Sequence, residues 1–176
     1  SGISVSLSCD GRTVAIGAHL NNGNNARNSG HVRVYQFDAN NSSTWTQVGG
    51  DIDGEGKYDL HGQRVSLSGD GRTVAIGAYN NVRVYQNDAS NSAWTQVGGD
   101  VDGEAAGDRT WISVSLSGDG RTVAIGAQVD MKFNVRVLTA PTPQPTAAPT
   151  PQPTAAPTPQ PTAATTPQPT AAPTPQ

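Results

Sequence analysis

The sequence is short of cysteine, of long apolar runs and, over most of its length, of proline. One cysteine, Cys9, in 176 residues excludes a disulfide framework within the chain and any cysteine-rich metal site. No stretch approaches the roughly 18 continuous apolar residues of a membrane span. The 14 acidic side chains outnumber the 11 basic ones, which argues against nucleic-acid binding because that needs a basic face. All 13 prolines lie at or after Pro141, so a globular core must come from residues 1–140.

Residues 1–140 consist of three near-identical copies of one unit. The string SVSLSCDGRTVAIGA begins at Ser4, and its counterparts begin at Arg64 and Ser113. A VRVYQ or VRVL segment follows in each copy, and WTQVGGD follows that segment in the first two copies. The copies differ in length only in their loops, so the strands are what the repeat preserves. The predicted units span about 1–58, 59–108 and 109–140.

Each unit predicts four short antiparallel strands. The first two strands are joined by Asp-Gly at 10–11, 70–71 and 119–120, which is a strong hairpin signal because glycine accepts a positive φ. No segment of helical length and period interrupts the strands, so the predicted class is all-β. Four antiparallel strands repeating every 40 to 60 residues are typical of β-propeller blades.

The chain holds about 2.7 such units, whereas closed propellers need about 4 to 8 blades. We therefore expect residues 1–140 to be part of a longer ring or an open arc that needs a partner. An incomplete ring exposes two apolar flanks, and the third unit is expected to end on an unpaired edge strand near Phe133–Leu138. Position 1 is serine, which favours a processed chain or a fragment, so the absence of a signal peptide decides nothing.

The repeated unit resembles two known families of propeller repeats. SLSGDGRTVAIGAYNNVRVYQ is similar to the core of a WD-repeat, although Tyr-Gln stands where Trp-Asp is usual. The whole unit is closer to the FG-GAP-like repeats of integrin-α-type propellers and of large algal and bacterial surface proteins. This resemblance covers residues 1 to about 139 and implies a propeller fold, while propellers host enzymes, adhesins and scaffolds alike.

Residues 141–176 contain only proline, threonine, glutamine and alanine, in a repeated octapeptide PTPQPTAA. Frequent proline denies this segment helix and sheet hydrogen bonds, so it is predicted to be disordered or an extended polyproline-II stalk. Threonine beside proline also predicts mucin-like O-glycosylation, with an unmodified flexible spacer as the alternative. The predicted acceptors are Thr142, Thr146, Thr150, Thr154 and Thr158.

Two acidic loops between units are the best chemical candidates for a metal site. DIDGEGKYD and DVDGEAAGD place oxygen ligands at positions 1, 3, 5 and 9, a spacing that suits Ca²⁺. The FG-GAP resemblance places the calcium cage between the first two strands, where this chain has only short turns. Solvated loops are therefore the alternative to calcium. The candidate ligands are Asp51, Asp53, Glu55, Asp59, Asp100, Asp102, Glu104 and Asp108.

Two further loops are candidates for contact and modification. Only the first unit has the long polar loop HLNNGNNARNSGH, and long loops on a rigid scaffold are common recognition sites. Asn40 and Asn41 each begin an N-x-S sequon in a predicted hairpin loop, which is compatible with N-glycosylation. The candidate contact residues are His19, Asn21, Asn22, Asn24, Asn25, Arg27 and His31.

The remaining reactive or repeated side chains are interpreted as structural. The histidines have no partner at metal or triad spacing and are expected in loops. Cys9 stands where the other units have glycine, so it is not expected to be a nucleophile, and an intermolecular disulfide is the alternative. Trp45 and Trp94 are expected to pack between blades. The recurring arginines, including Arg33 and Arg83, are expected to tie strands and turns together.

These features favour a non-catalytic extracellular or cell-surface module that recognises a protein or glycan from a Pro/Thr stalk. No serine lies in a nucleophile elbow and no phosphate loop is present, so an enzyme is not expected. The alternative is a structural component of a cell-wall or filament assembly, formed by edge-to-edge pairing of blades. No cofactor other than Ca²⁺ is suggested.

Overall fold

The computed structural model describes residues 2–23, 26–39, 43–88, 93–102, 109–129 and 132–139. Every regular element in these ranges is a β-strand, which confirms the predicted all-β class. The chain divides into two compact units, Ser1–Thr142 and Pro143–Gln176. The boundary predicted after Ala140 and the predicted stalk lie outside the described residues. Within the described ranges, no helix has the length and apolar character needed to cross a membrane.

The first repeat folds into one antiparallel sheet, called blade one here. Its strands are β1 (Ser4–Leu7), β2 (Thr13–Gly17), β3 (His31–Asp38), β4 (Thr44–Gln47) and β5 (Ile52–Asp53). They pair in the order β1-β2-β3-β4, and β5 pairs with β3 as well, beside the part of β3 that β4 leaves unpaired.

The short strand β5 was not predicted. β3 is eight residues long, and β4 covers only its second half, from Tyr35 to Asp38. The chain then bends away from this edge at Gly49, which has a φ of 70°. It rejoins the same edge further along, where Ile52 pairs with Val32. The predicted fourth strand is therefore two strands that share one edge of β3.

The second and third repeats fold in the same way, as blade two and blade three. Blade two contains β6 (Arg64–Leu67), β7 (Thr73–Gly77), β8 (Asn81–Asp88), β9 (Ala93–Gln96) and β10 (Val101–Asp102). Blade three contains β11 (Arg109–Leu116), β12 (Thr122–Val129) and β13 (Lys132–Thr139), paired in that order. In the described part of blade three no strand pairs with the outer edge of β13.

The predicted Asp-Gly hairpins are confirmed, and side chains hold each turn. In blade two, Ser68 Oγ donates to Asp70 Oδ1 at 2.6 Å and accepts from the Thr73 backbone N–H at 2.9 Å. The Arg72 backbone N–H also donates to Asp70, and Gly71 has a φ of 74°. The same bonds recur in blades one and three, so local sequence alone specifies these turns.

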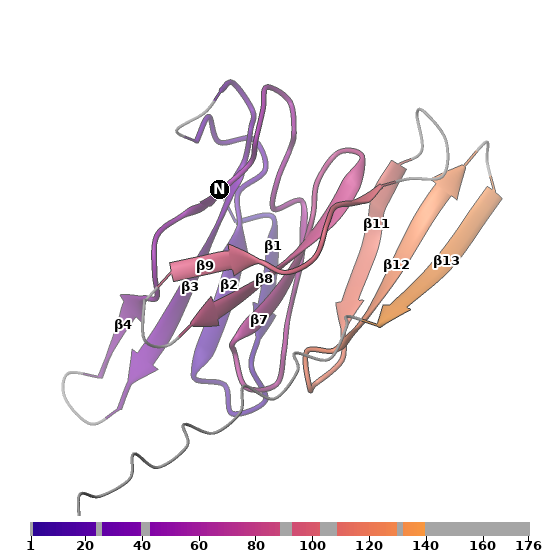
Figure 1. Ribbon diagram of the computed structural model, residues 1–176. Coiled ribbons are helices and arrows are strands. Elements are labelled where there is room, and N and C mark those ends of the chain that lie inside the picture. The colour runs from indigo at the N-terminus through magenta and orange to yellow at the C-terminus, as the bar shows by residue number, and fades with distance from the viewer. Residues whose placement is uncertain are drawn as a thin grey trace, which may run out of the picture. The chain divides into compact units, whose positions relative to one another are not determined.

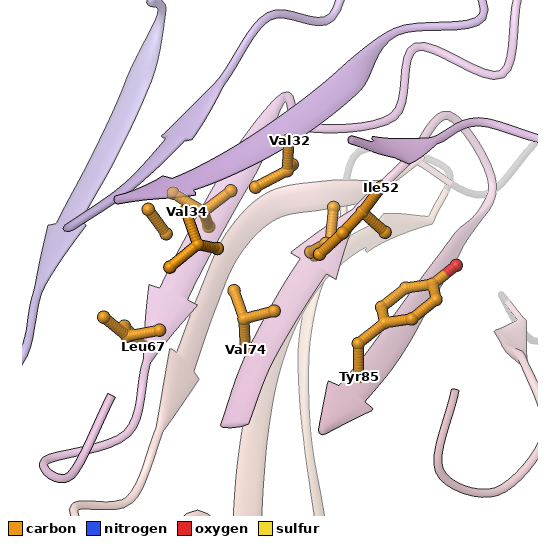
Figure 2. Close-up of a cluster of buried hydrophobic side chains, with 9 residues drawn as sticks. Val32, Val34, Ile52, Leu67, Val74 and Tyr85 are labelled. Carbon is orange, nitrogen blue, oxygen red and sulfur yellow. The ribbon is translucent and has the colours of Figure 1, made fainter. Parts of the chain in front are cut away.

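Blades one and two meet through apolar faces. Figure 2 shows Val32, Val34 and Ile52 of blade one pointing toward side chains of blade two, which include Val74 and Tyr85. The valines on both sides are fully buried. Both sheet faces of blade two are buried because a second interface forms behind it. That interface joins Ala75 and Val82 to side chains of blade three, namely Val123 and Ile125.

The two interfaces place the three blades side by side. In Figure 1 the sheet of β11, β12 and β13 lies beside the blade that holds β7 and β8, and β11 contacts β6, β7 and β8. Blade two therefore lies between the other two. Its loops have a neighbouring blade on either side, and one of them contributes to the candidate site.

Candidate binding site

The candidate site forms where the connection between β5 and β6 meets the turn between β7 and β8. The long loop after β2 supports that connection through backbone hydrogen bonds. Tyr58 N–H donates to Arg27 O at 3.0 Å, and Leu60 N–H donates to Asn28 O at 3.1 Å. Asn28, Tyr58 and Leu60 all have φ values between 54° and 64°, a conformation that is unusual for residues other than glycine. The surrounding contacts hold this backbone strain in place.

A buried arginine organises the side chains beneath this backbone. Arg83 on β8 has a side chain that is only 4% exposed. Its three nitrogens donate to three carboxylates at 2.9 to 3.0 Å, those of Asp100, Asp59 and Glu55. Burial alone would lower the pKa of Arg83, but the hydrogen bonds and charges of Asp59 and Asp100 raise it above its usual value. The guanidinium therefore stays charged and links two inter-blade loops to β8.

A surface pocket of about 800 Å³ lies over this network. Tyr58 and Tyr79 line it and remain 47% and 44% exposed. Lys57 Nζ lies 5.1 Å from the centre of the Tyr58 ring, within the range of a cation–π contact. The other lining residues that carry polar side chains are Glu55, Asp59, Asn80, Asn81 and Arg83. The pocket thus combines exposed aromatic rings with amides and charges.

His61 lies in the interior close to this network. It is fully buried, and its ring lies edge-on to Tyr85 with centroids 5.8 Å apart. Neither ring nitrogen has a hydrogen-bond partner among the described residues. Burial lowers the pKa of His61 to about 4, against the smaller opposing effect of the Asp59 charge. Burial likewise raises the pKa of Tyr85 to about 12.

The expectation that the histidines lie in loops is wrong for His31, whereas His61 does lie in the connection between β5 and β6 but is buried. His31 opens β3 and is 4% exposed, and Gly30 forms a parallel bridge with His61. This bridge draws both histidines into the packed region between blades one and two. His31 therefore cannot serve as a surface contact of the long loop, as its position in the sequence suggested.

The other described residues of the long loop are held in place by local hydrogen bonds. Asn21 O accepts from the Gly30 backbone, and Asn22 Oδ1 accepts from the Asn28 backbone at 3.2 Å. His19 and Asn21 line a second pocket of about 510 Å³, while Arg27 contributes its carbonyl to Tyr58. Asn24 and Asn25 lie outside the described residues. The contact role of this loop stays a prediction.

The acidic loops are engaged mainly with arginine. Asp51 accepts two hydrogen bonds from Arg33 Nε and Nη2 and one from Gln47 Nε2, and the Arg33 bonds lower the pKa of its carboxyl. The equivalent Asp100 accepts from Arg83 and from Gln96 Nε2 at 2.8 Å. These bonds confirm that the repeated arginines tie strands to turns. Among the described residues the four carboxylates of the first loop do not form one cluster.

The structure gives the predicted calcium ligands different surroundings. Asp51 and Asp53 come close to His31, with one ligand atom of each within 4.8 Å of the others. Glu55 and Asp59 instead lie at Arg83. The backbone carbonyl of Asp102, rather than its carboxylate, accepts from Arg136 at 2.8 Å. Calcium binding stays a prediction, and Arg33 and Arg83 are positioned to compete with any cation there.

Several predicted residues lie outside the described ranges. They are the metal candidates Glu104 and Asp108, the sequons Asn40 and Asn41, and the stalk threonines Thr142, Thr146, Thr150, Thr154 and Thr158. The pocket tyrosines, by contrast, were not predicted from the sequence. A usable signal existed, because Lys57 and Tyr58 stand where the next repeat has Ala106 and Gly107. Residues that differ between otherwise near-identical repeats indicate a role that only one repeat has.

Neither any protein-family model nor any curated protein matches this sequence. Solved structures do match. The complex of KlAtg21 with the coiled coil of AgAtg16 gives a TM-score of 0.57 at 18% identity, covering 80% of this chain and 40% of that chain. This likeness, together with the repeated antiparallel sheets, decides the fold. The described part of the chain is an arc of β-propeller blades. At this identity the likeness shows the fold alone.

Two other solved structures are similar at lower scores. The periplasmic gluconolactonase PpgL of Pseudomonas aeruginosa gives a TM-score of 0.49 at 20% identity, covering 75% of this chain and 38% of that chain. The hydrazine synthase of Kuenenia stuttgartiensis gives 0.48 at 14% identity, covering 78% and 32%. The chain therefore spans 32% to 40% of the length of these three structures.

Proposed function

We propose that this protein is a non-catalytic extracellular or cell-surface recognition module built from FG-GAP-like propeller blades. The pocket of Tyr58 and Tyr79 is its contact surface, and a glycan is its ligand. The single observation that carries this proposal is the pair of half-exposed tyrosine rings over a preformed polar network. The Pro/Thr segment after residue 140 acts as the stalk that holds the blades away from their point of attachment.

The chemistry of the pocket suits a sugar. The apolar face of a pyranose ring packs on an aromatic ring, and its hydroxyls need both donors and acceptors. Tyr58 and Tyr79 supply aromatic surface, and Asn80 supplies an amide with both donor and acceptor groups. Lys57 and Glu55 add charged groups at the same pocket.

The same pocket is built rigidly, which reduces the cost of binding. Arg83 holds Asp59 and Glu55 from below, and the Tyr79 backbone N–H donates to Asp59 O at 2.7 Å. Binding of a ligand therefore orders few protein groups, so less of the favourable contact energy is offset by lost conformational entropy. The carboxylates of Glu55 and Asp59 each accept a hydrogen bond from the Arg83 guanidinium, so their positions are fixed before a ligand arrives.

The test is binding of the labelled full chain to an array of immobilised glycans. We expect Tyr58→Ala and Tyr79→Ala each to weaken binding about fivefold, since loss of a stacked ring costs on the order of 1 kcal/mol. The matched controls Tyr58→Phe and Tyr79→Phe keep the rings and should bind nearly as well as the original chain. Absence of glycan binding, or alanine variants that bind equally well, would overturn the proposal. Capture of a protein ligand that depends on these tyrosines would replace the glycan.

A structural role is the second candidate, favoured by one specific observation. β13 pairs only with β12 in the described residues, so the N–H and C=O groups along its other edge face no strand. Such an edge can accept a strand from another chain. Edge-to-edge pairing of this kind would build the cell-wall or filament assembly considered above, and it would give polymers of increasing mass.

A further inference from the structure

Two exposed apolar faces lie at the two ends of the arc. On blade one, Val5 and Leu7 are 67% and 58% exposed. On blade three, Val135 and Val137 are 74% and 65% exposed. Exposed aliphatic patches of this kind are unusual on a finished soluble surface and mark interfaces. We call these surfaces the leading flank, on blade one, and the trailing flank, on blade three.

The leading flank is a copy of a surface that is already buried elsewhere in the molecule. Val5 and Leu7 correspond in the repeat to Val65 and Leu67 of blade two. Those two side chains are only 9% and 6% exposed, because they belong to the cluster that packs against blade one. The leading flank is therefore built to receive the face of a preceding blade.

The trailing flank is a copy of the complementary surface. Val135 and Val137 correspond in the repeat to Val32 and Val34 of blade one. Both of those valines are fully buried against blade two. The trailing flank is therefore built to receive the face of a following blade, and the two flanks are the two halves of the interface that forms twice within the chain.

We propose that a second copy of this chain covers both flanks, so that two arcs close into one ring. The trailing flank of each copy packs on the leading flank of the other. Two copies supply six blades, within the range of about 4 to 8 that closed propellers use. The two flanks differ from each other, so the contact is head-to-tail, and a two-fold ring satisfies every flank. This inference does not depend on the proposed glycan ligand.

Polar links between the blades extend the same pattern. The Cys9 backbone N–H donates to Gly69 O at 2.9 Å, and the Gly69 N–H donates to Gly118 O at 2.8 Å. In the ring, the Gly118 N–H meets the carbonyl of Cys9 of the partner subunit, which continues the series. A side-chain link repeats likewise. Ser6 Oγ accepts from Leu67 N–H, and Ser66 Oγ accepts from Leu116 N–H, each within 2.9 Å.

The first test is the mass of the full chain in solution, measured by sedimentation across a wide range of concentration. We expect a species of twice the 18.1 kDa chain mass that does not grow further as concentration rises. A chain that stays monomeric at every concentration overturns the proposal, whatever else covers the flanks in a larger assembly. Mass that increases without limit also overturns it and favours edge-to-edge polymers.

Charge substitutions on the flanks test the head-to-tail arrangement. Val5→Lys and Val135→Glu change exposed side chains, so each variant should fold but remain monomeric. A mixture of the two should regain the dimer. One interface in the mixture then joins two unaltered flanks, and the other places lysine on the flank opposite glutamate. A mixture that stays monomeric, or a single variant that still dimerises, contradicts this arrangement.

A cross-link tests the register of the contact. A Cβ built on Gly69 would lie 2.8 Å from Cys9 Sγ, so Gly69→Cys should form a disulfide within one chain. The equivalent change at the trailing flank, Gly118→Cys, meets no atom within 4 Å in the single chain. Under mild oxidation it should give a covalent dimer through Cys9 of the partner subunit. If Gly69→Cys closes its disulfide but Gly118→Cys gives no dimer, the ring is wrong although the blade packing is right.

Discussion

Arg33 and Arg83 occupy the same position in two repeats but have different surroundings. Arg33 is 44% exposed and binds one carboxylate, that of Asp51. Arg83 is 4% exposed and binds three, because blade two lies between two other blades. The same residue is therefore a surface ion pair in one copy and the centre of a buried network in the next. Equivalent residues of the repeats therefore contribute unequally to the stability of the fold.

This difference can be measured by replacing each arginine with methionine. We expect Arg83→Met to reduce the free energy of unfolding by about 3 kcal/mol, because Asp59 and Asp100, which are 13% and 29% exposed, lose the guanidinium that bonds them. The matched change Arg33→Met should cost less than about 1 kcal/mol, as exposed ion pairs do. Guanidinium unfolding curves of the two variants provide the comparison. Equal losses would mean that the Arg83 network does not stabilise the fold as described.

His61 should make the fold sensitive to mild acid. Its folded-state pKa of about 4 lies below the ordinary value of 6.5, so the unfolded chain binds a proton more readily. The associated stability is present above pH 6.5 and is lost as pH falls toward 4, by on the order of 3 kcal/mol. We expect His61→Phe to flatten the pH dependence of unfolding across this window. An unchanged slope in that variant would assign the acid sensitivity to other groups.

At the scale of the strand and turn, most of the fold could be predicted. The bonds among Ser68, Asp70 and Thr73 span six residues, so the sequence of one hairpin contains everything that the turn needs. β5 could not be predicted in this way. Its pairing depends on how far β4 extends along β3, which is a relation between three strands. Local sequence therefore specifies a hairpin, but it does not specify that two strands pair along one edge of a third.

The tryptophans at equivalent positions of β4 and β9 show the same limit. Trp94 on β9 packs against the cluster between blades one and two and donates its indole N–H to Val48 O at 2.9 Å, as expected for an inter-blade residue. Trp45 on β4 is 47% exposed instead and lies 5.4 Å from Phe37, centre to centre. No blade precedes blade one among the described residues, so Trp45 has no corresponding carbonyl to reach.

We therefore expect different costs when each tryptophan is changed to phenylalanine. Trp94→Phe leaves Val48 O without its donor and should destabilise the fold by about 1 kcal/mol or more. Trp45→Phe keeps the aromatic contact with Phe37 and should change stability by less than about 0.5 kcal/mol. Thermal unfolding of both variants gives the comparison. A larger loss at Trp45 would contradict the assigned packing of β4 and β9.

At the scale of the whole molecule, the repeats predicted the blades but not the pocket. Identical strings at Val65 and Val114 indicate that one packing arrangement recurs, and both residues do pack at inter-blade interfaces. Tyr58 and Tyr79 have no counterpart in the other repeats, and only the folded chain brings them together. Their nearness depends on the contact between two blades, so no local pattern could reveal it.

Successive repeats stack face to face in one register, and a single engineered disulfide tests this stacking most directly. The Gly69→Cys chain places a second thiol at the contact between the turns of blades one and two, next to Cys9. After mild oxidation of the folded protein, both thiols should disappear and the chain mass should fall by two hydrogens. Two thiols that remain titratable in the folded chain would show that the blades do not stack in this register.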